Sequence, residues 1–328
     1  MEKIKNIFSL FLRISISIVL LVLLFKFNKI DTQALIGDIK SANKVYLLIG
    51  LLINIFIYFL GFLRWKMLIK ATGIKILLGR LISSFSGGVF FSIFLPSTIG
   101  GDLVRSVDLA GHTKKAKEVV ATVFLDRLSG YIGLVLVVLI ALFLGRDLIL
   151  DRIVFSSVLA IIAVLIVVLL ILFNKFIYSK ISGFLTSPNS GKIRELIKDI
   201  HQEIHIFGSQ KKIIIFNLAI SFIIQVLFPL CVYYIGLALG IKISFIYFLI
   251  FLPLISAITL LPVAIGGLGL REGLFVLYFA KAGVIKQLAL AMSLLSFSFI
   301  VFTAAIGGII YVLTVHYRRL QPDQPSPL

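Results

Sequence analysis

Two stretches of the sequence combine helix-breaking residues with an arginine in a way that could bind an anion. Residues 95–105 read Leu-Pro-Ser-Thr-Ile-Gly-Gly-Asp-Leu-Val-Arg, and residues 261–271 read Leu-Pro-Val-Ala-Ile-Gly-Gly-Leu-Gly-Leu-Arg. In each, a proline ends an apolar run because it lacks the N–H that a helix needs, and a glycine pair lets the chain reverse. The amides after each glycine pair would start new helices, and helix starts attract anions. The forked guanidinium groups of Arg105 and Arg271 would add donors suited to phosphate.

Charged residues close to these two breaks complete a candidate binding site. A charge at the centre of a membrane helix costs about 2.5–3.5 kcal/mol on insertion scales, so charges at that depth indicate function. The carboxylates could neutralise the arginines when no substrate is bound, hold a cationic part of a substrate, or take up a proton. The candidate substrate-binding residues are Gly100, Gly101, Asp102, Arg105, Asp126, Arg127, Gly266, Gly267, Arg271 and Glu272.

The same residues could instead form structural ion pairs between helices. Arg105 has two acidic neighbours along the chain, Asp102 and Asp108, and either could pair with it. Because adjacent residues on a helix do not face one another, we expect Arg271 and Glu272 to have different partners. Both a binding site and a set of structural pairs therefore stay open from the sequence.

The composition indicates an integral membrane protein. Hydrophobic residues make up 60% of the chain and charged residues 14%, and the mean hydropathy is +1.14. Several apolar runs reach the roughly 18–20 residues that a helix needs to cross a bilayer. We therefore predict an all-α, polytopic helical membrane protein, with residues 1–328 as a single membrane domain.

Six apolar runs predict full membrane crossings, and two shorter runs predict re-entrant hairpins at the broken segments. The short limbs, 81–95 and 244–261, end at the two prolines. The broken stretches lie 166 residues apart, which indicates an inverted repeat with a first copy at 45–144 and a second at 211–313. If 244–261 and 268–282 crossed fully, the chain would have eight spans. The predicted crossings are residues 7–27, 45–63, 118–144, 153–174, 211–238 and 284–313.

The charge distribution predicts the orientation in the membrane. The chain has 32 basic and 14 acidic residues, and the basic ones cluster in loops beside apolar runs. The positive-inside rule and attraction to anionic lipid headgroups explain this pattern. We do not expect nucleic-acid binding, because the sequence offers no domain with a basic face that could carry it. We expect a multi-pass protein of the cell membrane with both termini cytoplasmic and with membrane phospholipids as partners, including anionic lipid headgroups at the cytoplasmic face. Residues 175–210 would form a basic cytoplasmic connection containing an amphipathic helix, and residues 316–328 a disordered tail.

No residue pattern predicts catalysis, a metal site or a cofactor. The sequence His-Gln-Glu-Ile-His at 201–205 places its glutamate at the wrong position for a metalloprotease and has no third ligand. The glycines from 267 to 273 have the wrong last spacing for a dinucleotide loop. Ser129 and Ser256 have no companion histidine at membrane depth. We therefore expect a transport-type protein and not an enzyme.

These motifs together resemble the lysylphosphatidylglycerol synthase transmembrane family. That family is the flippase-like membrane region of multiple-peptide-resistance-factor proteins and of many stand-alone homologues. Many members have a glutamate where this sequence has Asp126. The resemblance rests on Pro96 to Asp102 with Arg105, on Asp126-Arg127 with Gly130, and on Pro262 to Gly273.

The resemblance implies movement of lipid between leaflets, with aminoacylated phosphatidylglycerol as the best-known cargo. Relatives are also associated with glycolipid and isoprenoid carriers. We expect a stand-alone member without the soluble synthase domain, which would not make the lipid itself. The predicted function is a flippase-like lipid translocase for an anionic or aminoacylated phospholipid or a related lipid-linked headgroup. The headgroup would pass between the hairpin tips, where Arg105 and Arg271 should meet. The alternatives are a proton-coupled secondary transporter of a small anion and a membrane enzyme acting on lipid phosphates.

Overall fold

The part of the chain that the structure describes is built from helices. It is a computed structural model, in which the described residues form ten helices and no strand. The prediction of an all-α fold is therefore confirmed. The described residues are 30–95, 98–145, 152–173, 210–259 and 267–320, with a few positions between 15 and 26.

Four described helices are long and apolar enough to cross a membrane. They are α3 (Lys44–Ala71), α6 (Ala116–Leu144), α10 (Lys211–Ala238) and α13 (Lys286–Leu320). The 28 residues of α3 rise about 42 Å, which exceeds the roughly 30 Å hydrocarbon core. Only 11% of the most apolar window of α3 and 17% of that of α10 is buried inside the protein. Their remaining apolar surface therefore faces outward, as a helix in contact with lipid requires.

These helices agree with four of the six predicted crossings, and α7 (Arg152–Phe173) coincides with a fifth, 153–174. The predicted first crossing, 7–27, lies almost wholly outside the described residues, as does the connection 175–210 with its amphipathic helix. A short helix, α2 (Thr32–Ser41), precedes α3. Helix α13 continues to Leu320 and so includes the start of the segment 316–328 that we expected to be disordered.

Each broken stretch separates two short helices that pack against each other. In the first half these are α4 (Leu78–Phe94) and α5 (Thr98–Thr113), and in the second α11 (Phe245–Thr259) and α12 (Leu270–Lys281). The predicted breaks are therefore present, although Pro96 and residues 260–266 lie outside the described residues. Gly267 and Gly269 lead into α12 with φ of 75° and 83°, a backbone conformation that favours glycine.

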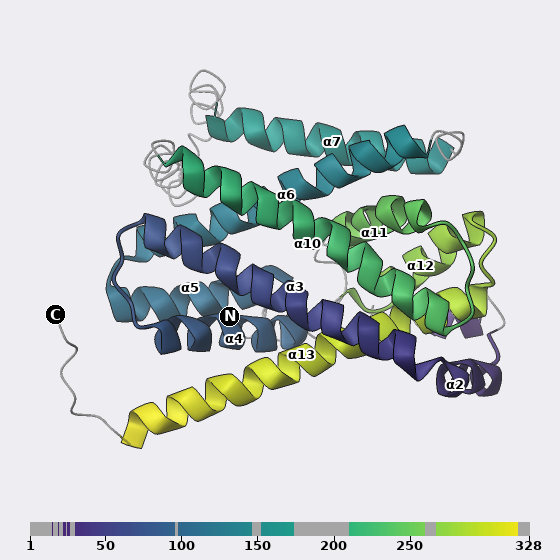
Figure 1. The fold of residues 1–328 in the computed structure, drawn as a ribbon, viewed down its shortest axis with the longest axis horizontal. Helices are drawn as coiled ribbons and strands as arrows, with labels where there is room; N and C mark the ends of the chain where they lie inside the picture. The colour runs from purple at the N-terminus through teal and green to yellow at the C-terminus, as the bar shows by residue number, and fades with distance from the viewer. Residues whose placement is uncertain are drawn as a thin grey trace.

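The helices of the two halves follow the same order and pack in matching pairs. Helix α3 packs on α10, its counterpart in the second half. Helix α4 packs on α13 as α11 packs on α6, and α5 packs on α6 as α12 packs on α13. Figure 1 shows α3 and α10 running through the middle of the molecule, with α4 and α5 towards one end and α11 and α12 towards the other. An internal repeat predicts that the short helix of each half packs on a long helix of the other half, as α4 and α11 do. The opposite orientation of the two halves across the membrane stays a prediction.

The two halves differ in what fills their cores. The second half packs aromatic rings between α11 and α12, among them Phe248, Phe251 and Phe279, which are almost fully buried. The first half instead packs around Trp65 of α3, whose indole Nε1 donates to Thr122 Oγ1 of α6 at 3.3 Å. The buried charged side chains Asp102, Arg105 and Asp126 also lie in the first half.

Candidate functional site

Five charged side chains from α3, α5 and α6 form one connected ionic network. Asp126 accepts hydrogen bonds from Arg64 Nε at 2.6 Å and from Arg105 Nη2 at 2.9 Å. Asp102 pairs with Arg105 Nη2 at 2.8 Å and also accepts from Arg127 Nε. Each carboxylate thus serves two arginines, and the network joins the first hairpin to both neighbouring long helices.

Arg105 lies at the centre of this network and is 5% exposed. Its Cζ atom lies 4.8 Å from the centroid of the Trp65 ring and 5.8 Å from that of Phe85, so two aromatic faces cover the guanidinium group. Helix α5 reaches this position because Gly88 of α4 leaves room: a methyl group there would lie 3.1 Å from Arg105 Cβ. Arg105 is therefore enclosed by protein and connects two aspartates.

Arg64 belongs to the network although we did not select it from the sequence. Its Nη1 donates to Ser221 Oγ of α10 at 3.0 Å, and Asn217 Nδ2 donates to the Arg64 carbonyl at 3.2 Å. The predicted second crossing ended at residue 63, which placed Arg64 in a basic loop. Because α3 continues to Ala71, Arg64 lies inside a long helix. The sequence signal that could have identified Arg64 is its position one residue beyond the predicted crossing.

In the second half, an ion pair lies at the start of α12. Glu272 is fully buried; its Oε2 accepts from the Gly269 amide at 2.6 Å, and its Oε1 accepts from Arg271 Nε at 3.1 Å and from Ser293 Oγ at 3.3 Å. Arg271 Nη2 also pairs with Glu272, and Arg271 Cζ lies 4.4 Å from the Phe297 ring centroid. The expectation of separate partners for Arg271 and Glu272 is therefore wrong. Both side chains are in the first helical turn, where Glu272 folds back to the helix start and the long arginine side chain follows it.

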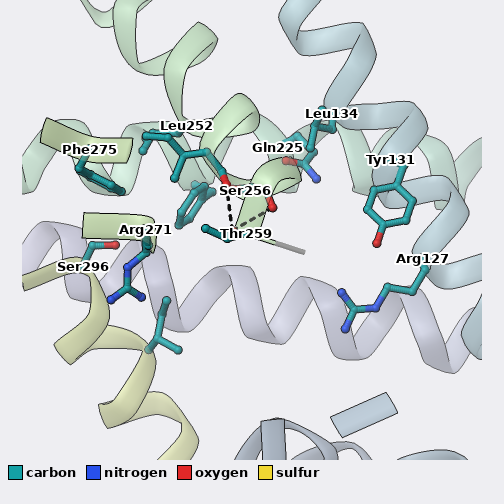
Figure 2. A pocket seen from close by; sticks show the side chains of 13 residues that line it. Arg127, Tyr131, Leu134, Gln225, Leu252, Ser256, Thr259, Arg271, Phe275 and Ser296 are labelled. Carbon is teal, nitrogen blue, oxygen red and sulfur yellow. Dashed lines mark hydrogen bonds between the residues drawn. The ribbon is translucent and has the colours of Figure 1, made fainter. Parts of the chain in front are cut away.

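A cavity of about 280 Å³ lies between α6, α10, α11, α12 and α13. Two arginines line it, Arg127 from α6 and Arg271 from α12. Figure 2 shows Arg127 and Tyr131 on one side and Arg271 on the other, with the Arg127 side chain extending towards the middle. The other lining residues are polar (Tyr131, Gln225, Ser256, Thr259, Ser296) or apolar (Leu134, Phe228, Leu252, Ile255, Phe275, Ile300).

A family model described as "Lysylphosphatidylglycerol synthase TM region" matches residues 10–308. The chain belongs to this family. A UPF0104 membrane protein of Methanothermobacter thermautotrophicus is 25% identical over 273 residues, which cover 77% of this chain and 80% of the relative. A UPF0104 membrane protein of Pyrococcus horikoshii is 26% identical over 273 residues, covering 76% and 81%. No solved structure matches the chain.

In this member of the lysylphosphatidylglycerol synthase TM family, the predicted site residues fall into separate groups. Arg127 and Arg271 line the same cavity, whereas Arg105, which we expected to accompany Arg271, is not among the lining residues. Gly100 and Gly101 serve close packing beside Leu95 and Gly88. Gly266 lies outside the described residues. In the described part of the chain, no group of three or more histidine, cysteine, aspartate or glutamate side chains could hold a metal.

Proposed function

We propose that this protein is a lipid translocase, which moves an anionic or aminoacylated phospholipid or a related lipid-linked headgroup between leaflets. Its membership of the lysylphosphatidylglycerol synthase TM family and its long apolar helices support a role in the lipid bilayer. We further propose that it moves the lipid without modifying it, in the cell membrane and with both termini in the cytoplasm.

The observation that carries this proposal is the pair of arginines at one cavity. Guanidinium groups bind phosphate through paired, charge-assisted hydrogen bonds, and the low dielectric of a membrane strengthens these. Pockets that enclose a drug-sized ligand measure roughly 300–1,000 Å³. At about 280 Å³ the cavity has room for a headgroup, and the acyl chains would stay in the bilayer.

The ionic network explains how Arg127 is presented to this cavity. The Arg127 side chain is 35% exposed, against 12% for Arg64 and 6% for Arg105. Asp102 accepts from Arg127 Nε, and this pair holds the guanidinium group of Arg127 at the wall of the cavity. In this scheme Arg105 and Asp126 hold Asp102 and α6 in place, and Arg127 is the arginine of the network that contacts the headgroup, together with Arg271 of the second half.

We expect Arg127→Gln and Arg271→Gln each to lower the rate of lipid movement at least about tenfold. A hydrogen bond to a charged group contributes about 1.5–3 kcal/mol, and glutamine keeps a donor but loses the charge. The measurement is dithionite quenching of fluorescent phosphatidylglycerol in proteoliposomes. Arg152→Gln is the matched control, because Arg152 is exposed and does not line the cavity. Unchanged rates in both cavity variants, with normal expression, would rule out this site.

The same proteoliposomes distinguish a lipid translocase from the alternative, a proton-coupled transporter of a small anion. Such a protein would move free phosphate into the vesicles and leave the labelled lipid where it started. Uptake of radiolabelled phosphate driven by a pH gradient, without lipid movement, would therefore contradict the translocase proposal and support the anion transporter.

The proposed inverted repeat places corresponding turns on opposite faces of the membrane. In a Cys231→Ala background we expect Lys286→Cys, at the first residue of α13, to react with a membrane-impermeant maleimide in intact cells. Lys115→Cys, before α6, should react only after permeabilisation, because it follows the corresponding hairpin in the first half. Both positions are exposed in the structure. Labelling of both from the same side would mean that the two halves are not inverted.

A further inference from the structure

A second cavity, the lateral groove, lies between α3, α4 and α13 and measures about 120 Å³. It is distinct from the cavity lined by Arg127 and Arg271, the arginine cavity. Ile55, Ile306 and Ile310 line the lateral groove and are 39%, 38% and 36% exposed. Because α3 and α13 are both long and apolar enough to cross a membrane, these exposed isoleucines face hydrocarbon. The lateral groove therefore opens towards the lipid chains of the bilayer.

The lateral groove offers a ligand apolar surface and little width. Helix α4 contributes Phe85 and Val89 to its wall. The hydroxyl group of Thr303, which also lines it, donates to the Phe299 carbonyl at 3.0 Å and accepts from Asn54 Nδ2 at 3.4 Å, so it is already bonded within the protein. At about 120 Å³ the groove is smaller than the roughly 300–1,000 Å³ of pockets that enclose a drug-sized ligand. It therefore suits a segment of a hydrocarbon chain.

The internal repeat relates the lateral groove to the arginine cavity. Helices α3, α4 and α13 are the counterparts of α10, α11 and α6, which contribute to the arginine cavity. At the offset of 166 residues between the two broken stretches, Ser86 and Val89 of the groove correspond to Leu252 and Ile255 of the cavity. Each half thus forms a pocket at an equivalent place. One pocket is lined by arginines and the other by apolar side chains, which suits the two parts of an amphipathic lipid.

The face of α13 that lines the arginine cavity continues into the lateral groove. Ser296 and Ile300 line the cavity, and Thr303, Gly307 and Ile310 line the groove. Residues three and four positions apart are neighbours on a helix surface, so these residues form one stripe along α13. Figure 1 shows α13 running from the end of the molecule that holds α12 towards the end that holds α4. An elongated ligand that follows this stripe reaches both pockets.

The length of this stripe matches the thickness of one membrane leaflet. From Ile300 to Ile310 an α-helix rises about 15 Å at 1.5 Å per residue. The hydrocarbon core of a bilayer is roughly 30 Å thick, so one leaflet accounts for about half of it. Ile300 lies at the middle of the apolar part of α13, Lys286–Val315. The arginine cavity therefore lies near the middle of the span, and the lateral groove extends from there through the leaflet at the C-terminal end of α13.

We infer that the lateral groove binds one acyl chain of the same lipid whose phosphate lies in the arginine cavity. This inference rests on the proposed translocase function and adds a site for the chain. Because the surrounding bilayer is as apolar as the groove, the groove orients the chain and contributes little affinity of its own. The affinity comes from the phosphate, so occupancy of the groove depends on the arginine cavity.

Photo-crosslinking in proteoliposomes tests the inference with the unchanged protein. The probe is phosphatidylglycerol with a diazirine near the end of one acyl chain, and mass spectrometry locates the labelled residues. We expect label on Val89 of α4 and on Ile306 and Ile310 of α13. Label confined to the outer faces of α3 and α10, in vesicles that still move lipid, would overturn the inference and leave the translocase function standing. If these vesicles move no lipid in the dithionite assay, the translocase proposal itself fails.

A variant that fills the lateral groove tests the same inference from the protein side. Val89→Phe overpacks the groove, so we expect it to lower the labelling of α13 at least about fivefold and lipid movement at least about threefold. Val312→Phe is the matched control, because Val312 is 60% exposed on α13 and is not among the residues that line the groove. Wild-type labelling in Val89→Phe would contradict the inference. If Val89→Phe does not fold, Ile306→Phe at the exposed rim carries the same comparison.

The dependence on the arginine cavity shows whether one lipid occupies both pockets. Arg271→Gln removes a charged partner of the phosphate, and we expect it to lower the labelling of Ile306 and Ile310 at least about fivefold. Arg152→Gln, the control used for transport, should label as the wild type does. Undiminished groove labelling in Arg271→Gln would mean that any membrane lipid enters the lateral groove, which contradicts the inference.

Discussion

At the scale of single residues, shared carboxylates decide how the buried charges are arranged. Asp126 is 4% exposed and pairs with Arg64 and Arg105, which come from two different helices. Removing one partner from a buried ion pair leaves a charge that neither water nor protein compensates. The residues most sensitive to substitution should therefore be the aspartates, because each pairs with two arginines and its loss removes two ion pairs at once.

Asp126→Asn should destabilise the protein by about 3–5 kcal/mol, the typical cost of breaking a buried ion pair. Thermal unfolding in detergent, followed by far-ultraviolet circular dichroism, measures the change. Asp31→Asn makes the same chemical change at the exposed N-cap of α2, where asparagine caps as well as aspartate, and should have little effect. Similar melting temperatures for both variants would show that the network is not a structural element.

The sequence could predict which residues carry charge into the membrane but not which of them reach the cavity. Arg105 and Arg127 are both arginines beside aspartates. A helix that is apolar on all sides has no preferred buried face, so the rotation of α6 cannot be derived from its pattern. That rotation comes from packing against α3, α5, α7, α10 and α11, and it brings Arg127 to the cavity, whereas Arg105 lies on α5 and is enclosed.

At the scale of helices, the sequence predicted the elements well because their ends are chemically marked. The predicted crossing 211–238 coincides with α10, and α4 ends at Phe94, just before Pro96. Glycine pairs marked the breaks, but their main role in the first half is to bring α4 and α5 into contact. A methyl group at Gly88 would lie 2.8 Å from the Gly101 carbonyl oxygen, and one at Gly101 would overlap the Gly88 carbonyl.

Gly101→Ala should therefore separate α4 from α5 and destabilise the protein by about 1–3 kcal/mol, as overpacking of a core does. The matched control is Gly111→Ala on the same helix, where no atom lies within 4 Å of an added methyl group. Because alanine favours the helix by up to about 1 kcal/mol over glycine, the control should be neutral or slightly stabilising. Melting temperatures that rank the two variants in the opposite order would refute close packing at Gly101.

At the scale of the whole molecule, the two halves have the same order of helices but different cores. The first half holds an ionic network around Trp65, and the second holds an aromatic core around α11 and α12. The cavity lies mainly in the second half, and α6 is the first-half element that lines it, through Arg127, Tyr131 and Leu134. The second-half hairpin thus lines the cavity through Arg271, and the first-half hairpin supports Arg127 through Asp102.

The central claim is that Arg127 and Arg271 hold one lipid phosphate between them, and an experimental structure with bound phosphatidylglycerol tests it most directly. The account predicts phosphate density in the cavity within hydrogen-bonding distance of both guanidinium groups, with the acyl chains leaving towards the bilayer. Phosphatidylglycerol density only on the outer surfaces of α3 and α10, with the cavity holding nothing but water, would contradict it.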